Sequence, residues 1–240
     1  MILRTILGIA CVFAVLLVAA NHPQPLFPWS VTEGNLSLYS DEVFPALDGE
    51  EVLLSVRDKL RNSPLYSDED QCSAFVCNSR WRRVLFLGSD RGGGVSNYPV
   101  AQHVFLSGAD IQGNRLISPS GMPDLLGREL DHFIAHEIAH ILTGKTAGSL
   151  ALYFHPDWII EGYAEYVGWG AAFELEEGML AFLQDDPRMS TPPQVPYLRY
   201  CLLIAILLEE KGCSVEELLA ADLTQADAEA MLRADAEGQY

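Results

Sequence analysis

Apolar residues recur at helical spacing in several stretches of the chain, and these stretches predict most of its regular structure. A helix is expected within 41–62, where the apolar residues with this spacing are Val52, Leu53, Val56 and Leu60. Four later stretches predict further helices: 123–143, 156–168, 171–185 and 197–211. Ser214 and Glu217 form a capping-box pattern, which predicts a short helix over 214–221 with an acidic helix after it.

Short apolar runs between turn-forming residues predict strands in the first half of the chain. We expect strands at 83–87, 100–106 and 115–117. Residues 21–40 are rich in proline and aromatic residues and predict an extended lead-in, and the glycines at 92–94 predict a flexible loop. Because strands precede helices, the expected fold class is α+β, with a small N-terminal sheet followed by helices.

The first 20 residues have the pattern of a targeting segment rather than of a folded domain. Arg4 precedes an uncharged run over 6–20, and Val18-Ala19-Ala20 provides small residues at which a signal peptidase can cut. The run is short for a membrane span, which takes about 20 apolar residues. We expect a cleaved signal peptide, with an uncleaved anchor through residues 5–20 as the alternative. Residues 21–240 are then one exported domain, in a periplasmic, extracellular or lumenal location.

Composition limits the partners and the covalent links of the chain. The net charge of −18 is spread along the sequence, which indicates a solubilising surface and excludes a nucleic-acid partner, since phosphate binding needs clustered Lys and Arg. Four cysteines follow residue 20: Cys72, Cys77, Cys201 and Cys213. Cys72 and Cys77 are close enough along the chain to bridge. Cys201 and Cys213 would be about 18 Å apart on one continuous helix, beyond disulfide reach, and can pair only if the chain turns back after Gly212.

The strongest chemical signal is the segment His136-Glu137-Ile138-Ala139-His140. Residues four apart lie on the same face of a helix, so both imidazoles can face one ion, and Glu137 can reach a water molecule held there. The surrounding helix is apolar almost all round and is expected to be buried, where histidines and a carboxylate need partners. The segment therefore predicts a Zn²⁺ site with His136 and His140 as ligands and Glu137 as general base.

A zinc hydrolase needs a third protein ligand, and a second predicted helix offers two. Glu161 and Glu165 lie one helical turn apart in the segment Trp158-Ile159-Ile160-Glu161-Gly162-Tyr163-Ala164-Glu165-Tyr166. His155, just before that helix, is a further candidate. The residues alone leave these three open.

The two segments together resemble the gluzincin metallopeptidases, the group that includes thermolysin and aminopeptidase N. The resemblance covers about residues 125–170 and implies a zincin-like fold, Glu161 as the third zinc ligand, and Glu165 as the residue that orients a ligand histidine. It also implies a peptide or protein substrate lying along the strand at 115–117. Ile160 stands where aminopeptidases usually have Asn, and no GxMEN-type motif is present, so aminopeptidase specificity is not implied.

The resulting hypothesis is a zinc metallopeptidase that cleaves peptide bonds by attack of zinc-bound water. Tyr197 is the preferred donor to the oxyanion that forms; the other candidates are Tyr163, Tyr166, Arg199 and Tyr200. One alternative is a zinc-stabilised binding or envelope-associated protein without catalysis. A second is a precursor in which Cys72 or Cys77 caps the metal.

Overall fold

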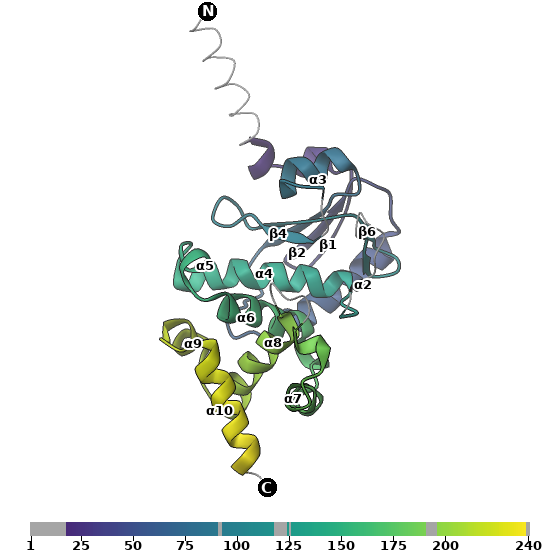
Figure 1. Ribbon diagram of the computed structural model, residues 1–240. Helices are drawn as coiled ribbons and strands as arrows, with labels where there is room; N and C mark the ends of the chain where they lie inside the picture. The colour runs from purple at the N-terminus through teal and green to yellow at the C-terminus, as the bar shows by residue number, and fades with distance from the viewer. Residues whose placement is uncertain (1–17, 91–92, 118–123, 125, 191–195, 239–240) are drawn as a thin grey trace, which may run out of the picture.

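The N-terminal half of the chain forms a five-stranded mixed sheet (Figure 1). The computed structural model describes residues 18–90, 93–117, 124, 126–190 and 196–238. The strands of the sheet are β1 (Trp29–Glu33), β2 (Leu36–Ser40), β3 (Cys72–Val76), β4 (Gly94–Ser96) and β5 (His103–Leu106), in the order β1-β2-β3-β5-β4. The pairs β2–β3 and β3–β5 are parallel, and the outer pairs are antiparallel. A separate antiparallel pair consists of β6 (Ala109–Asp110) and β7 (Arg115–Leu116).

Successive side chains of the central strands point to opposite faces of this sheet, and both faces are covered by other parts of the protein. Ala74 and Val76 of β3 enter the main hydrophobic core, whereas Phe75 between them joins a smaller cluster with Phe27 and Phe105. Helix α3 (Arg80–Leu87) covers the smaller cluster, and α2 (Ala46–Leu60) and α4 (Leu130–Ala147) lie on the main-core side. Both faces of the central strands are therefore buried, which suits parallel pairing.

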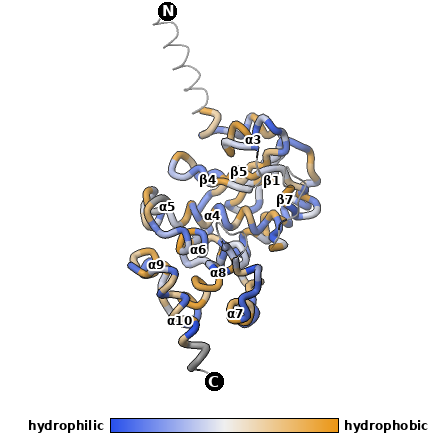
Figure 2. Tube along the Cα trace, viewed as in Figure 1, coloured by the Kyte–Doolittle hydropathy of each residue, from blue (hydrophilic) through white to orange (hydrophobic). Residues whose placement is uncertain are grey.

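The C-terminal half is helical and packs against the side of α4 away from the sheet (Figure 1). Its helices are α5 (Ala151–Phe154), α6 (Asp157–Trp169), α7 (Leu175–Leu183), α8 (Tyr197–Ala205), α9 (Val215–Ala220) and α10 (Gln225–Gly238). A π-helical turn, Ile206–Glu210, extends α8, and 3-10 turns lie at Gln24–Leu26, Gly170–Ala172 and Pro187–Ser190. Figure 2 shows hydrophilic and hydrophobic residues alternating along α10. Helix α4 lies between two layers, and nearly all of its first fifteen residues are buried.

Helices α6 and α8 pack closely together at Gly162. A Cβ atom at this position would lie 2.8 Å from the carbonyl oxygen of Tyr200 and 2.8 Å from a side-chain carbon of Ile204. Contacts this short do not occur between real side chains, so only glycine allows the two backbones to come this close. The residue before it is Glu161, so the close approach fixes the position of that carboxylate relative to α8.

The fold class α+β, with the sheet first and the helices after it, is confirmed. The strand predicted at 83–87 is wrong, because these residues belong to α3, which Ser79 precedes and which ends at Gly88 in a left-handed conformation. The extended lead-in at 21–40 contains the hairpin β1–β2, and the predicted glycine loop contains β4. The predicted helices are present with shifted ends: 123–143 begins only at Leu130, and 197–211 changes to the π-helical turn at Ile206. The capping box of Ser214 and Glu217 is confirmed, with both of its hydrogen bonds.

Cys72, Cys77, Cys201 and Cys213 are all free thiols. The bridge considered between Cys72 and Cys77 is wrong, because an extended strand separates residues five apart by about 16 Å. Cys72 faces the main core and Cys77 the smaller cluster, and burial raises the pKa of each thiol to about 12. Neither belongs to a group of described residues that could hold a metal, which argues against a cysteine-capped precursor.

Most of the predicted targeting segment, residues 1–17, lies outside the described residues. The described chain begins at Val18, beside α3 and opposite the C-terminal helices (Figure 1). Within the described ranges, no helix combines the length and the apolar character needed to cross a bilayer. The division into a 1–20 leader and a 21–240 domain stays a prediction.

Candidate metal centre

Helix α4 carries the first residues of the centre and holds them inside the protein. It is packed between the sheet with α2 on one side and α6 on the other, and residues 130–132 and 134–144 are all buried. His136, Glu137 and His140 are therefore removed from bulk water, as the apolar pattern of the helix predicts. Buried imidazole and carboxylate groups need specific partners, and α6 provides them.

Three potential metal ligands converge where α4 faces α6. The Nε2 atoms of His136 and His140 are 3.2 Å apart. The Oε2 atom of Glu161 lies 3.3 Å from Nε2 of His136 and 3.7 Å from Nε2 of His140. The structure thus brings together the three residues that the sequence and the gluzincin resemblance single out, and Glu161, with 28% of its side chain exposed, marks the open side of the group.

Glu165, one turn further along α6, receives donors from several directions and is fully buried. Its Oε2 atom lies 3.1 Å from Nδ1 of His136, so it contacts the nitrogen of that ring opposite to the one that faces Glu161. The indole Nε1–H of Trp169 donates to its Oε1 atom at 3.1 Å. A carboxylate on the outer nitrogen fixes the ring orientation and tautomer of a metal-binding histidine, which is the arrangement expected of Glu165.

Two further partners of Glu165, His132 and Arg128, escaped the sequence analysis. Nε2 of His132 is 3.2 Å from the carboxylate, and Nη1 of Arg128 lies 3.3 and 3.4 Å from its two oxygens. Asp124 in turn holds the guanidinium through a contact of 2.9 Å. A signal was available for His132, because residues 132, 136 and 140 lie four apart and continue the face of the motif toward the N-terminus of the helix.

The described residues therefore contain two groups that could hold a metal ion. One consists of His136, His140 and Glu161, and the other, completely buried, of His132, His136 and Glu165. The two groups share His136 through different ring nitrogens. His155, the other third-ligand candidate, belongs to neither group.

Glu137 points from α4 toward the edge strand β4. A Cβ atom on Gly94 would lie 2.8 Å from both Cγ and Oε1 of Glu137, so this carboxylate occupies the space that the glycine leaves. A backbone hydrogen bond from Ser96 also reaches it. The edge strand beside the predicted active helix is thus β4. The strand expected at 115–117 is present as β7, which pairs with β6 in a separate two-stranded sheet, and a substrate lying along it stays a prediction.

The pKa values of the metal-free centre follow from burial and the mutual contacts of its residues. Burial lowers the pKa of His136, but the hydrogen bonds to Glu161 and Glu165 outweigh this and raise it to about 10. Burial and the charge on His136 lower the pKa of His140 to about 4, while burial raises that of Glu137 to about 7. Burial of Glu165 is outweighed by its contacts with His132, His136 and Arg128, which hold its pKa well below the usual range. Of the two histidines, His136 is thus the one that these contacts favour in the protonated form.

Tyr197 is next to the centre, at the start of α8. Its ring lies edge-on to His136 with 6.0 Å between ring centroids, and the Arg128 guanidinium lies over it at 4.7 Å. Burial raises the pKa of its hydroxyl to about 12, so the group stays a proton donor at neutral pH. Two other candidates for the oxyanion donor have hydrogen-bond partners away from the centre. The Tyr163 hydroxyl bonds Ser63 at 2.6 Å, and Arg199 donates to the Met189 carbonyl.

In comparisons with known proteins, no family model, no curated protein and no solved structure matches this chain. The gluzincin resemblance therefore stays a prediction carried by the two segments and by the arrangement of their side chains.

Proposed function

We propose that this chain is a zinc-dependent peptidase of gluzincin type, in which His136, His140 and Glu161 bind the metal and Glu137 is the general base. The observation that carries the proposal is the convergence of three ligand atoms from two helices, with a buried carboxylate beside them. An exported location, with residues 1–20 as signal or anchor, belongs to the same proposal.

The spacing of the three donor atoms suits zinc. With bonds of 2.0–2.1 Å and tetrahedral angles, the ligand atoms of a zinc ion lie about 3.3–3.4 Å apart. The separations here are 3.2, 3.3 and 3.7 Å. Two imidazoles and one carboxylate form a known ligand set for catalytic zinc, and three protein ligands leave a fourth position free.

The second group of His132, His136 and Glu165 suits a metal less well. Its carboxylate already accepts from the Trp169 indole, and the Arg128 guanidinium lies 3.3 Å away. A divalent cation at this point would be repelled by the guanidinium at short range in a medium of low dielectric constant. Glu165 has no exposed surface, so no substrate could reach an ion bound there. We therefore assign to this group the task of orienting His136.

The protein residues have separate tasks in the proposed reaction. A bound zinc ion supplies Lewis acidity, which polarises a carbonyl group and makes water a stronger nucleophile at neutral pH. Glu137 accepts the proton of the attacking water and delivers it to the leaving amine. Glu165 keeps Nε2 of His136 directed at the metal position by binding its Nδ1 side. Tyr197 is the residue we propose to donate to the oxyanion.

A peptide substrate is favoured by the edge strand beside Glu137. β4 is an edge strand of the main sheet within the described residues, so its outer edge, where the Ser96 backbone already contacts Glu137, offers backbone groups for pairing with an added extended chain. Gly94 leaves room for the Glu137 side chain against this edge. A peptide bound along β4 would thus have a backbone carbonyl close to the general base.

Metal content and hydrolysis measured together test the proposal. We expect about one zinc ion per purified chain, a sharp loss in His140→Ala and Glu161→Ala, and retention in Glu137→Gln. Peptide mixtures analysed by mass spectrometry should show cleavage by the wild type and none by Glu137→Gln. A folded wild type without zinc affinity would refute the proposal, and zinc retention in Glu161→Ala would refute the ligand assignment. Full zinc with unchanged cellular function in Glu137→Gln would favour the non-catalytic binding protein.

A further inference from the structure

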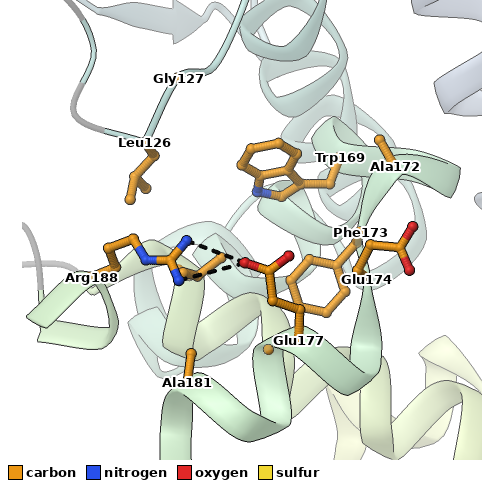
Figure 3. A pocket seen from close by; sticks show the side chains of 11 residues that line it. Leu126, Gly127, Trp169, Ala172, Phe173, Glu174, Glu177, Ala181 and Arg188 are labelled. Atoms are coloured by element: carbon orange, nitrogen blue, oxygen red, sulfur yellow. Dashed lines mark hydrogen bonds and ion pairs between the residues drawn. The ribbon is translucent and has the colours of Figure 1, made fainter. Parts of the chain in front are cut away.

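A cavity of about 380 Å³ lies at the end of α6, beyond the metal centre (Figure 3). Its walls come from the end of α6 with the turn after it, from α7, from the 3-10 turn that carries Arg188, and from Leu126, Gly127 and Leu198. Figure 3 shows the Trp169 ring facing the Arg188–Glu177 ion pair, with the Phe173 ring beside Glu177. None of these residues has a task in the proposed hydrolysis.

Three walls of the cavity adjoin residues of the centre. Trp169 donates to Glu165, Leu198 follows Tyr197 in the chain, and Gly127 precedes Arg128. Trp169 is eight residues after Glu161 on the same helix, which corresponds to about 12 Å along the axis. An extended peptide advances about 3.3 Å per residue, so this separation corresponds to about four substrate residues.

The charges around the cavity favour a cation. Arg188, the one basic residue in its lining, lies 3.4 Å from Glu177 and 3.1 Å from Asp186, so two carboxylates already hold it. Glu174 adds a third carboxylate, which has no hydrogen bond or ion pair among the described residues. The surroundings of the cavity therefore carry an excess of negative charge. A carboxylate ligand would have to compete with Asp186 and Glu177 for Arg188.

The apolar walls of the cavity favour a cation that is carried on an aliphatic chain. The Trp169 and Phe173 rings can pack against an aliphatic stem, and an aromatic face also attracts a cation directly. Lys and Arg side chains combine such a stem with a charged end, which could reach Glu174 and Glu177 at the rim. We infer that this cavity is a specificity subsite that binds a basic side chain of the peptide substrate. The inference rests on the proposed peptidase function for its biological meaning, but the binding itself needs no catalysis.

Binding to the zinc-loaded Glu137→Gln full chain tests the subsite without turnover. The probe is an alanine–glycine hexapeptide with one lysine, compared by calorimetry with the same peptide carrying norleucine, which keeps the stem and lacks the charge. We expect the lysine peptide to bind about tenfold more tightly at low salt, and the preference to shrink at high salt. Equal binding of the two peptides would overturn the inference.

Two further variants with opposite expected effects separate recognition from damage to the fold. Glu174→Gln in the same background should remove most of the preference for lysine. Arg188→Gln should increase it, because it removes the competing cation, whereas a general disturbance of α7 would weaken binding in both variants. A preference for lysine that survives Glu174→Gln combined with Glu177→Gln would overturn the inference. Lysine binding in a wild-type chain that cleaves no peptide would refute the peptidase proposal and leave the subsite standing.

Discussion

Replacement of Glu165 by Gln tests whether this residue orients a ligand or binds the metal itself. The amide keeps the shape of the side chain and can still accept from Trp169, but it removes the negative charge between His136 and Arg128. If Glu165 only orients His136, zinc should still bind. If the group with His132 is the metal site, the substitution removes a ligand.

The expected magnitudes follow from the contacts. Loss of a carboxylate that orients a ligand histidine weakens metal affinity about 10- to 100-fold. Breaking a buried ion pair costs about 3–5 kcal/mol of unfolding free energy. We expect a value near the lower end, about 3 kcal/mol, because Asp124 remains 2.9 Å from Arg128 and can still balance its charge.

The pH dependence of this stability difference has a definite sign. The folded-state pKa of Glu165 lies well below its ordinary value, so the carboxylate stabilises the fold above the pKa of the unfolded chain, about 4.3. The contribution is lost as the pH falls through the lower folded-state pKa. The difference between wild type and Glu165→Gln should therefore be complete at pH 7 and shrink in acid.

Chelator competition gives the zinc affinity, and urea unfolding in the presence of a chelator gives the stability of the metal-free protein. Glu51→Gln is the matched control, since Glu51 is exposed on α2 and should change neither quantity. The reasoning is refuted if Glu165→Gln loses zinc as completely as Glu161→Ala, or if it changes neither affinity nor stability.

Three further predictions concern the pKa of His136, the glycine beside Glu137 and a helix cap. Zinc binding at pH 7–8 should release about one proton, because the pKa of His136 is about 10 without metal, and calorimetry in buffers of different ionisation enthalpy measures this. Gly94→Ala should lower kcat/KM about 100-fold with zinc content unchanged, because the new methyl group would lie 2.8 Å from Glu137; unchanged peptide cleavage would contradict the assigned geometry. Ser214→Ala should cost about 1 kcal/mol in urea unfolding, since it removes the acceptor for the Glu217 N–H; no change would mean that this cap contributes nothing to stability.

The sequence predicts the long helices well and the sheet poorly, for physical reasons. The apolar residues of α2 and α6 recur at helical spacing over several turns, so a single polar residue on the apolar face does not hide the pattern. The strand β3 has the sequence Cys-Ser-Ala-Phe-Val and is buried on both faces, so it lacks both the alternation and the β-branched content that mark a strand. For an eight-residue helix such as α3, the apolar run is too short to establish a period.

The sequence predicts those residues of the candidate site that lie close together in one segment of the chain. The spacing of His136 and His140 on one helix specifies their common face, and the resemblance adds Glu161 and Glu165. What the spacing does not contain is the side chain that crosses from another element. Arg128 precedes α4 and reaches Glu165 on α6, and only the packing of these helices brings the two charges together.

The missing side chain at Gly162 has a consequence for motion. Because α6 and α8 pack together without an intervening side chain there, a movement of α8 relative to α6 would shift Tyr197 relative to Glu161. Gly162→Ala should therefore disturb the placement of Tyr197 beside the centre, although it changes no residue of the centre itself.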